Sequence, residues 1–228
     1  MRMAGPATSG GAFRRFGSPE PQMAALQRLS IFPLPGALLF PRGRLPLHIF
    51  EPRYRALVSD ALARDRRISM IQPRGAGEPP PLFDIGCIGR IKEVERLEDG
   101  RFNLVLEGMA RFRIVRELDV ATPFRQVEAD VAPFADENDP EPLPSIVRAE
   151  IEREARRFAD ARGVAIDWTG VSRLDDETLV NAIAAIAPFD VAAKQALLEA
   201  PTLTERADLL AQFLGFFRRG DDEPSTLQ

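Results

Sequence analysis

The chain offers few residues for nucleophilic or metal chemistry, because it contains one histidine, His48, and one cysteine, Cys87. A Ser/His/Asp or Cys/His arrangement would have to use His48, which lies in an apolar, strand-like run. We expect His48 to be a structural residue, partly buried and hydrogen-bonded, and Cys87 to be a small buried hydrophobe. A zinc site built from one His and one Cys would need carboxylates to complete it, so we expect no metal.

A P-loop and a serine–lysine dyad would each need a lysine, and the sequence contains two lysines, Lys92 and Lys194. A P-loop has the pattern G-x-x-x-x-G-K-[ST], but neither lysine follows a glycine or precedes Ser or Thr. A serine–lysine dyad requires a buried lysine with a depressed pKa. Lys92 lies among charged neighbours in a strand pattern, and Lys194 has Asp190 at i−4, as in a surface pair. We therefore predict no catalytic residue, no cofactor and no enzymatic activity.

The composition is that of an ordinary soluble globular protein, with 45% hydrophobic and 28% charged residues among 228. The net charge of −4 gives no reason to expect nucleic acid as a partner. No apolar run approaches the ~20 residues that a membrane span requires, so we expect no membrane contact. A single thiol cannot form an intrachain disulfide, which favours a reducing compartment and hence the cytoplasm.

The charge is distributed unevenly, which indicates two structural units. Residues 26–134 carry 17 basic and 14 acidic residues, a net charge of +3, whereas residues 135–228 carry 10 basic and 19 acidic residues, a net charge of −9. Residues 1–25 are rich in Gly, Ala, Pro and Ser and are predicted to be a disordered leader, unless the true start codon lies further along. Residues 220–228 are predicted to be a disordered tail.

Residues 26–134 are predicted to form mainly strands with one inserted helix. The helix is expected to begin at Pro52, where a missing N–H costs nothing, and to end near Asp65. Asp99-Gly100 between two apolar runs predicts a hairpin. Several short strands at close spacing are typical of a small barrel or sandwich. The predicted strands are Gln27–Leu34, Leu45–Phe50, Ile68–Gln72, Ile85–Leu97, Phe102–Leu106, Arg111–Leu118 and Phe124–Val131.

Residues 135–144 are predicted to be a linker, because proline and acidic residues dominate them, and residues 145–219 are predicted to form a helical bundle. Asp175 and Asp190 are expected to cap two of the helices. Thr202 and Glu205 have the spacing of a capping box at a third. The residues expected to face the core from the helix that follows Asp175 are Leu179, Val180, Ile183 and Ile186.

Several motifs together resemble a known family. The run Phe32-Pro33-Leu34-Pro35-Gly36, then Leu39-Phe40-Pro41 and Leu45-Pro46-Leu47-His48-Ile49-Phe50-Glu51-Pro52-Arg53-Tyr54, resembles the opening of the substrate-binding domain at the N-terminus of Lon-type proteases. Phe83–Ile91, Asp99–Gly108 and Arg111–Ile114 resemble its central strand, its hairpin and the strand after it, in the same order. The helical part resembles that of short bacterial proteins that carry this domain alone, without ATPase or protease modules.

The resemblance implies an α+β fold, a PUA-like β pseudobarrel with one inserted helix followed by a C-terminal helical bundle. It also implies a non-catalytic module that recognises unfolded or exposed polypeptide segments. A groove beside the barrel, edged by the linker, is the expected place, and an exposed strand edge could pair with a peptide backbone. An adaptor or regulator of a separate ATP-dependent protease is one form of this role. RNA binding, known for other PUA-like barrels, is the alternative, and a hydrolase that uses His48 is a third interpretation.

Four residues of the motif are our candidates for peptide contact, namely Phe32, Leu34, Phe40 and Tyr54, although such residues more often belong to a core. The remaining motif residues are expected to be mostly structural. Prolines fix extended or turn geometry, and glycines permit bends or close backbone approach. These mostly structural residues are Pro33, Pro35, Gly36, Pro46, His48, Phe50, Glu51, Pro52, Arg53, Gly86, Gly89, Gly108, Arg111 and Phe112.

Overall fold

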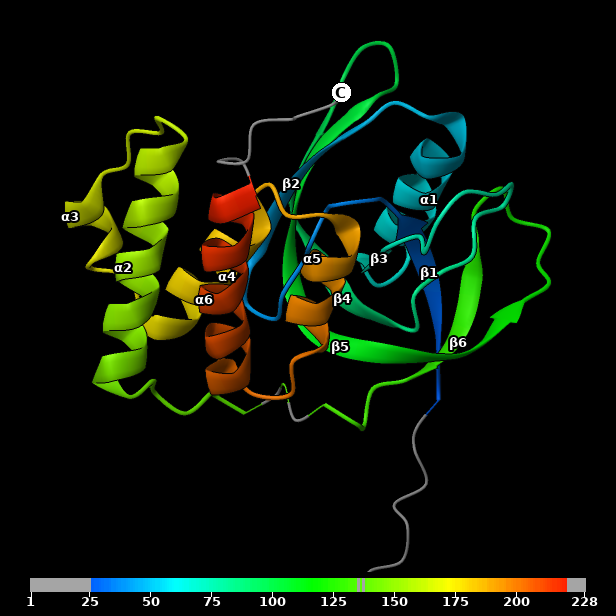
Figure 1. Ribbon diagram of the computed structural model, residues 1–228. Helices are drawn as coiled ribbons and strands as arrows, with labels where there is room; N and C mark the ends of the chain where they lie inside the picture. Colours follow the sequence, from blue (N-terminus) through cyan, green and yellow to red (C-terminus); the bar gives the residue numbers. More distant parts are fainter. Residues whose placement is uncertain (1–25, 135, 137, 221–228) are drawn as a thin grey trace, which may run out of the picture.

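The computed structural model describes residues 26–134, 136 and 138–220. Both the predicted leader and residues 221–228 of the predicted tail lie outside the described residues. The described chain forms a strand-rich part followed by a helical part, which lie side by side in Figure 1. This arrangement confirms the predicted α+β class with a C-terminal helical region.

Six strands form one mixed sheet, in the order β2-β5-β4-β3-β1-β6. Because β6 also pairs with β5, five of the strands close into a ring and β2 remains at the edge. Neighbouring strands are antiparallel, except that β1 and β3 are parallel. The strands are β1 (Gln27–Pro33), β2 (Arg44–Ile49), β3 (Arg67–Ile71), β4 (Ile85–Arg96), β5 (Phe102–Leu118) and β6 (Gln126–Asp130).

Strand β5 corrects one prediction, since it runs without interruption where two separate strands were expected. Its first half pairs with the edge strand β2, and its second half pairs with β6. This one strand therefore both holds β2 and closes the ring. Gly108 lies at the change of partner, where a Cβ atom would collide with the carbonyl oxygen of Phe40. The hairpin between β4 and β5 is confirmed, with Gly100 at a φ of +79°.

One helix, α1 (Pro52–Ala63), lies within the strand-rich part and begins at Pro52 as expected. The bundle contains α2 (Ser145–Ala161), α3 (Trp168–Val171), α4 (Asp176–Ile186), α5 (Val191–Glu199) and α6 (Leu203–Gly220). The predicted caps are confirmed, because the carboxylates of Asp175 and Asp190 accept from the N–H groups of Thr178 and Ala193. Thr202 and Glu205 exchange hydrogen bonds as a capping box does. The short helix α3 was not predicted.

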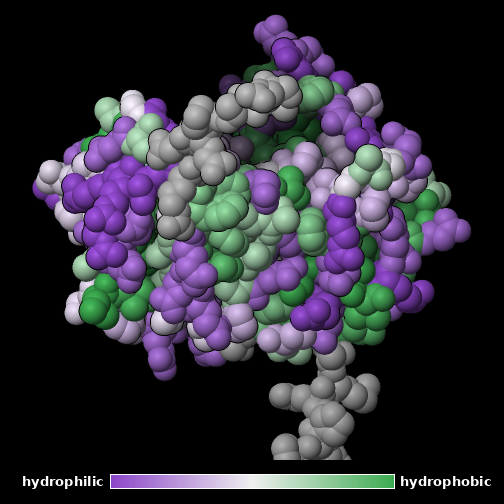
Figure 2. Space-filling model, in the orientation of Figure 1, coloured by the Kyte–Doolittle hydropathy of each residue, from purple (hydrophilic) through white to green (hydrophobic). Residues whose placement is uncertain are grey.

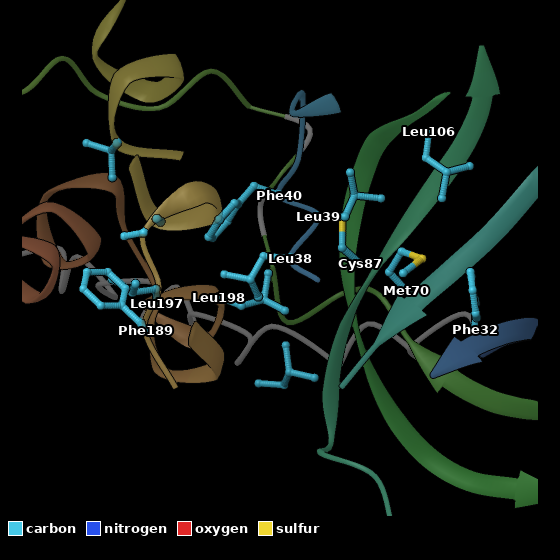
Figure 3. Close-up of a cluster of buried hydrophobic side chains, with 14 of the residues drawn as sticks. Phe32, Leu38, Leu39, Phe40, Met70, Cys87, Leu106, Phe189, Leu197 and Leu198 are labelled. Atoms are coloured by element: carbon cyan, nitrogen blue, oxygen red, sulfur yellow. The ribbon is translucent and has the colours of Figure 1, made fainter. Parts of the chain in front are cut away.

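Buried apolar residues from both parts form one continuous cluster. Figure 3 shows Phe189, Leu197 and Leu198 of the helical part facing Leu38 and Phe40, with Leu39, Cys87 and Met70 on the barrel side. A second, smaller cluster draws residues from each of the five strands of the closed ring, namely Leu29, Ile31, Ile71, Ile88, Phe112, Val127 and Ala129. The boundaries of the predicted linker and of the two units stay predictions.

Candidate functional site

Three of the four candidate contact residues lie in the core. The exposed fractions of Phe32, Phe40 and Tyr54 are 5%, 2% and 6%, and Leu34 is half-buried against the same cluster. The rings of Phe32 and Tyr54 pack with their centroids 4.1 Å apart. These side chains therefore stabilise the barrel, and their contact with a peptide stays a prediction.

The glycines of the motif lie where the backbone or a core ring comes close. A Cβ atom on Gly86 would collide with the carbonyl oxygen of Met70, and one on Gly89 would lie 2.8 Å from a methyl carbon of Leu39. Gly36 has a φ of +74°, in the region that glycine adopts without strain. Gly86 and Gly89 therefore permit close packing in the barrel, and Gly36 permits the turn after β1.

The strand-to-helix corner of the motif lies at the surface. Glu51 and Arg53 form an ion pair of 2.9 Å across Pro52, and Phe50 is 60% exposed. The expectation that His48 is partly buried is wrong, because it lies on an outward-facing position of the edge strand β2. Its Nδ1 is 2.7 Å from Oδ1 of Asn103, so the expected hydrogen bond is present.

Arg111 of the motif joins the barrel to the bundle. Its side chain is 4% exposed and forms a 2.9 Å ion pair with Asp136, to which its backbone N–H also donates. The same guanidinium donates to the carbonyl oxygens of Leu198 and Ala200, between α5 and α6. A buried charge is tolerated when it is paired and hydrogen-bonded in this way.

Lys194 corrects a second prediction, because it is buried rather than part of a surface pair. Its Nζ donates to the carbonyl oxygens of Gly36 in the barrel and Ala185 in α4, each at 3.0 Å. Burial lowers the pKa of this ammonium group. Asp190, the expected partner, caps α5 instead. The amine thus ties two main-chain segments together, since both of its hydrogen-bond partners are carbonyl oxygens.

The hollow at the edge of the linker, where a groove was expected, is polar. Its volume is about 350 Å³, and residues 138–141 of the linker form one side. Arg42, with a φ of +62°, closes one end by a bidentate ion pair with Glu177 of α4, with distances of 2.6 and 2.8 Å. Arg206 forms part of the wall, and burial, followed by the nearby charge of Arg111, lowers its pKa to about 10. This hollow offers much less apolar surface than the one among α2, α3 and α4.

A different hollow, which we call the bundle groove, is almost entirely apolar. It lies among α2, α3 and α4, with Leu214 of α6 at its floor, and its volume is about 380 Å³. Arg162 is its one charged lining residue. In Figure 1, α2 and α3 lie on the side of the bundle away from the barrel. The lining residues are Ala155, Phe158, Ala159, Arg162, Val164, Ile166, Trp168, Val171, Leu174, Leu179, Ala182, Ile183, Ile186, Ala187, Pro188 and Leu214.

Local sequence explains why this groove forms. Gly163, with a φ of +64°, ends α2, and Asp167 then caps α3 through the N–H of Thr169. Helix α3 is four residues long and contains no fully buried residue, so it forms a thin wall in place of a full helix. Trp168 lies half-buried on this wall, with the guanidinium of Arg156 at 4.4 Å from its ring centroid.

Two large apolar side chains that line the groove are exposed to solvent. Ile186 is 76% exposed and Val164 is 52% exposed. The prediction that Ile186 faces the core is therefore wrong, because α4 buries Leu179, Val180 and Ala184 while its last residue reaches the rim of the groove.

The face of the molecule seen in Figure 2 is hydrophilic over α2, and hydrophobic residues gather around α5 and α6.

Two of the residues considered for chemistry lie in surroundings that oppose reactivity or serve structure. Burial raises the pKa of the Cys87 thiol, which opposes formation of the reactive thiolate. Lys92 forms a 2.6 Å ion pair with Glu107 at the surface. Among the described residues, no group of three or more His, Cys, Asp or Glu side chains is placed to hold a metal ion, and no helix in the described ranges is long and apolar enough to cross a membrane.

A family model matches most of the chain. Residues 28–215 match the model for the substrate-binding domain of ATP-dependent protease La (LON). The chain belongs to the LON substrate-binding domain family. This finding confirms the resemblance inferred from the motifs, and the match covers both the barrel and the bundle.

Curated relatives and solved structures agree with this family. The chain is 29% identical over 194 residues to Lon protease 2 of Myxococcus xanthus and 24% identical over 197 residues to the Lon protease of Escherichia coli K12. These alignments cover 82% and 84% of this chain but 23% and 25% of the relatives, so the chain spans about a quarter of their length.

The fold is similar to that of two solved LON domains. The N-terminal domain of Mycobacterium avium complex Lon protease matches with a TM-score of 0.61 at 20% identity, covering 83% of this chain and 98% of that one. A Lon N-terminal domain protein from Xanthomonas campestris matches with a TM-score of 0.58 at 21% identity and the same coverage. At these identities, the likeness supports the fold alone.

Proposed function

We propose that this LON-domain protein recognises exposed apolar segments of other polypeptides without catalysing a reaction on them. Membership of a substrate-binding family supports the class of ligand. The bundle groove is the proposed binding site, because it combines an almost wholly apolar lining with the exposed side chains of Ile186 and Val164. An apolar pocket of this size accepts one or two large side chains of a partner.

The expected affinity is modest. Burying one Leu- or Phe-sized side chain contributes about 1.5–3 kcal/mol, and association costs at least ~4 kcal/mol in lost freedom. Two such side chains contribute about 3–6 kcal/mol, which leaves little net free energy, so we expect a dissociation constant of the order of 1 mM even with backbone contacts. A weak site that accepts many sequences suits a protein that binds unfolded chains transiently.

We also propose a role as an adaptor or regulator in protein quality control, acting with a separate ATP-dependent protease. The relatives that support this are Lon proteases, of which this chain matches about a quarter. A single buried thiol, Cys87, is compatible with a reducing compartment, and we place the protein in the cytoplasm as part of the proposal. The comparisons do not favour the RNA-binding alternative.

The test compares two isoleucines that are equally exposed. Ile186 and Ile146 are each 76% exposed, but only Ile186 lines the groove. Fluorescence anisotropy would follow binding of a labelled unfolded polypeptide to the wild type, Ile186→Glu and Ile146→Glu. We expect Ile186→Glu to weaken binding at least tenfold and Ile146→Glu to leave it unchanged.

A labelled structured RNA, measured at low and moderate salt, serves as the second ligand. Binding to an apolar groove should survive added salt, whereas RNA binding falls steeply with salt. Saturable RNA binding without polypeptide binding would overturn the proposed function. Equal affinity of the two isoleucine variants would overturn the placement in the groove.

A further inference from the structure

Among the described strands, the sheet keeps one open edge, along β2. This strand pairs with β5 on one side only, whereas every other strand has at least two neighbours. Hydrogen-bonded and non-hydrogen-bonded pairs alternate along an antiparallel ladder, and the N–H of Gly108 donates to the carbonyl oxygen of Gly43 at 2.9 Å. The main-chain groups of Arg44, Pro46 and His48 therefore point away from β5. We call these three the open-edge residues.

Pro46 removes the central donor of this edge. Proline has no N–H, and its ring occupies the place from which an N–H would reach a neighbouring strand. The edge therefore offers carbonyl groups at all three positions but N–H groups only at Arg44 and His48. Any added strand that pairs with two adjacent open-edge residues must include Pro46, because it is the middle one. A two-fold symmetric pair of copies centred on Pro46 would set the two proline rings against each other.

Two further features protect the same edge. The side chain of Arg44 is 63% exposed and lies 3.6 Å from Glu93, so the edge carries charge. Helix α4 lies beside the start of β2, across a hollow of about 300 Å³ whose lining includes Gly43 and Arg44 on one side and Ala182 and Ala185 on the other. Proline, charge and a covering helix are three ways in which natural sheets avoid pairing at their edges.

We propose that β2 is closed to strand addition and that Pro46 is the residue that closes it. The excluded partner is a β-strand, from a second copy of this chain or from an unfolded polypeptide, because both present the same alternating main-chain groups. Without such protection, an open edge is a template for edge-to-edge association. This inference concerns the barrel and does not depend on binding in the bundle groove.

The first test restores the missing N–H. Pro46→Val places a strand-forming residue with a donor at the same exposed position. We expect this variant to self-associate at least about tenfold more tightly than the wild type, because two copies then exchange hydrogen bonds at the centre of the edge. Sedimentation over a range of concentrations measures the association. Pro142→Val, at an exposed proline outside the sheet, is the matched control and should sediment as the wild type does.

The second test observes the wild type itself, so it does not depend on how the variant folds. Hydrogen exchange resolved by residue should show fast exchange at the amides of Arg44 and His48, at every protein concentration and with an unfolded polypeptide present. The amides of Leu45 and Leu47, which face β5, should exchange slowly. In Pro46→Val, exchange at His48 should slow as the concentration rises.

Each outcome bears on the closed edge. Slower exchange at Arg44 and His48 of the wild type, at high concentration or with the polypeptide, would overturn closure of the edge. Self-association of Pro46→Val no tighter than that of the wild type would overturn the role of Pro46. Equal association of Pro46→Val and Pro142→Val would overturn it as well, because an added valine, and not the restored N–H, would then be the cause.

Discussion

The junction between barrel and bundle differs in kind from the bundle groove. Apolar residues of both parts are buried together at the junction, and the buried side chains of Arg111, Lys194 and Gln195 make hydrogen bonds across it. The groove has a thin wall, few polar groups and exposed apolar side chains. The contrast indicates that the junction holds the fold together and that the groove is available to a partner.

The largest effect on stability is expected at the junction. Arg111→Met removes one half of a buried ion pair and leaves Asp136 buried without its partner, which should lower the free energy of unfolding by about 3–5 kcal/mol. Urea denaturation measures this loss. The double variant Arg111→Met with Asp136→Leu is the control, and we expect it to recover part of the stability. A loss below 1 kcal/mol for the single variant would contradict the role given to the junction.

A smaller loss is expected at Gly108, where β5 lies against the loop that joins β1 to β2. Gly108→Ala places a Cβ atom against the carbonyl oxygen of Phe40, and overpacking of this kind costs about 1–3 kcal/mol. Thermal unfolding measures the effect, and Gly75→Ala, at a glycine with open space around it, shows what backbone strain at a loop glycine costs without a collision. A loss within about 0.5 kcal/mol for Gly108→Ala would show that the close approach of Phe40 does not restrict this position.

The cap of α4 is expected to contribute less. Asp175→Ala should cost about 1 kcal/mol, because the carboxylate accepts from the N–H and hydroxyl of Thr178. These hydrogen bonds lower the pKa of Asp175, so its contribution is present above the ordinary carboxyl pKa and is lost as the pH falls through the lowered value. Urea titrations at neutral and acidic pH measure this, and an Asp175→Ala variant that loses as much stability on acidification as the wild type would contradict it.

The groove should show the smallest effect on stability. Ile186→Glu replaces an exposed side chain, so we expect a change within about 0.5 kcal/mol, while Leu179→Ala, from the buried face of the same helix, should cost about 2–5 kcal/mol. Chemical denaturation of both variants gives the comparison. A strongly destabilised Ile186→Glu would show that the groove belongs to the core.

Much of the fold could be predicted from the sequence, because its signals are local. Pro52, the Asp99-Gly100 hairpin and the helix caps each act on neighbouring residues. The pairing of Arg111 with Asp136 and the burial of Lys194 were missed because each depends on segments far apart in the chain. An aromatic residue looks the same in a sequence whether it packs or binds, so the burial of Phe32, Phe40 and Tyr54 could not be read from the motif alone.

The groove itself had no clear sequence signal. Helix α3 is too short for apolar periodicity to be seen, and the apolar residues around Trp168 follow no helical or strand spacing. The length of the connection between α2 and α4 does carry a signal, since residues 162–175 contain only the four-residue helix α3. Long connections in compact domains are often functional.

Hydrogen–deuterium exchange, with and without an unfolded polypeptide, tests the central claim most directly, because one experiment observes the junction and the groove together. We predict slower exchange in the second half of α2, in α3 and at the end of α4, with no change at β2 or at the hollow lined by Arg42 and residues 138–141. Protection at β2 or at that hollow, with none in the groove, would contradict the account.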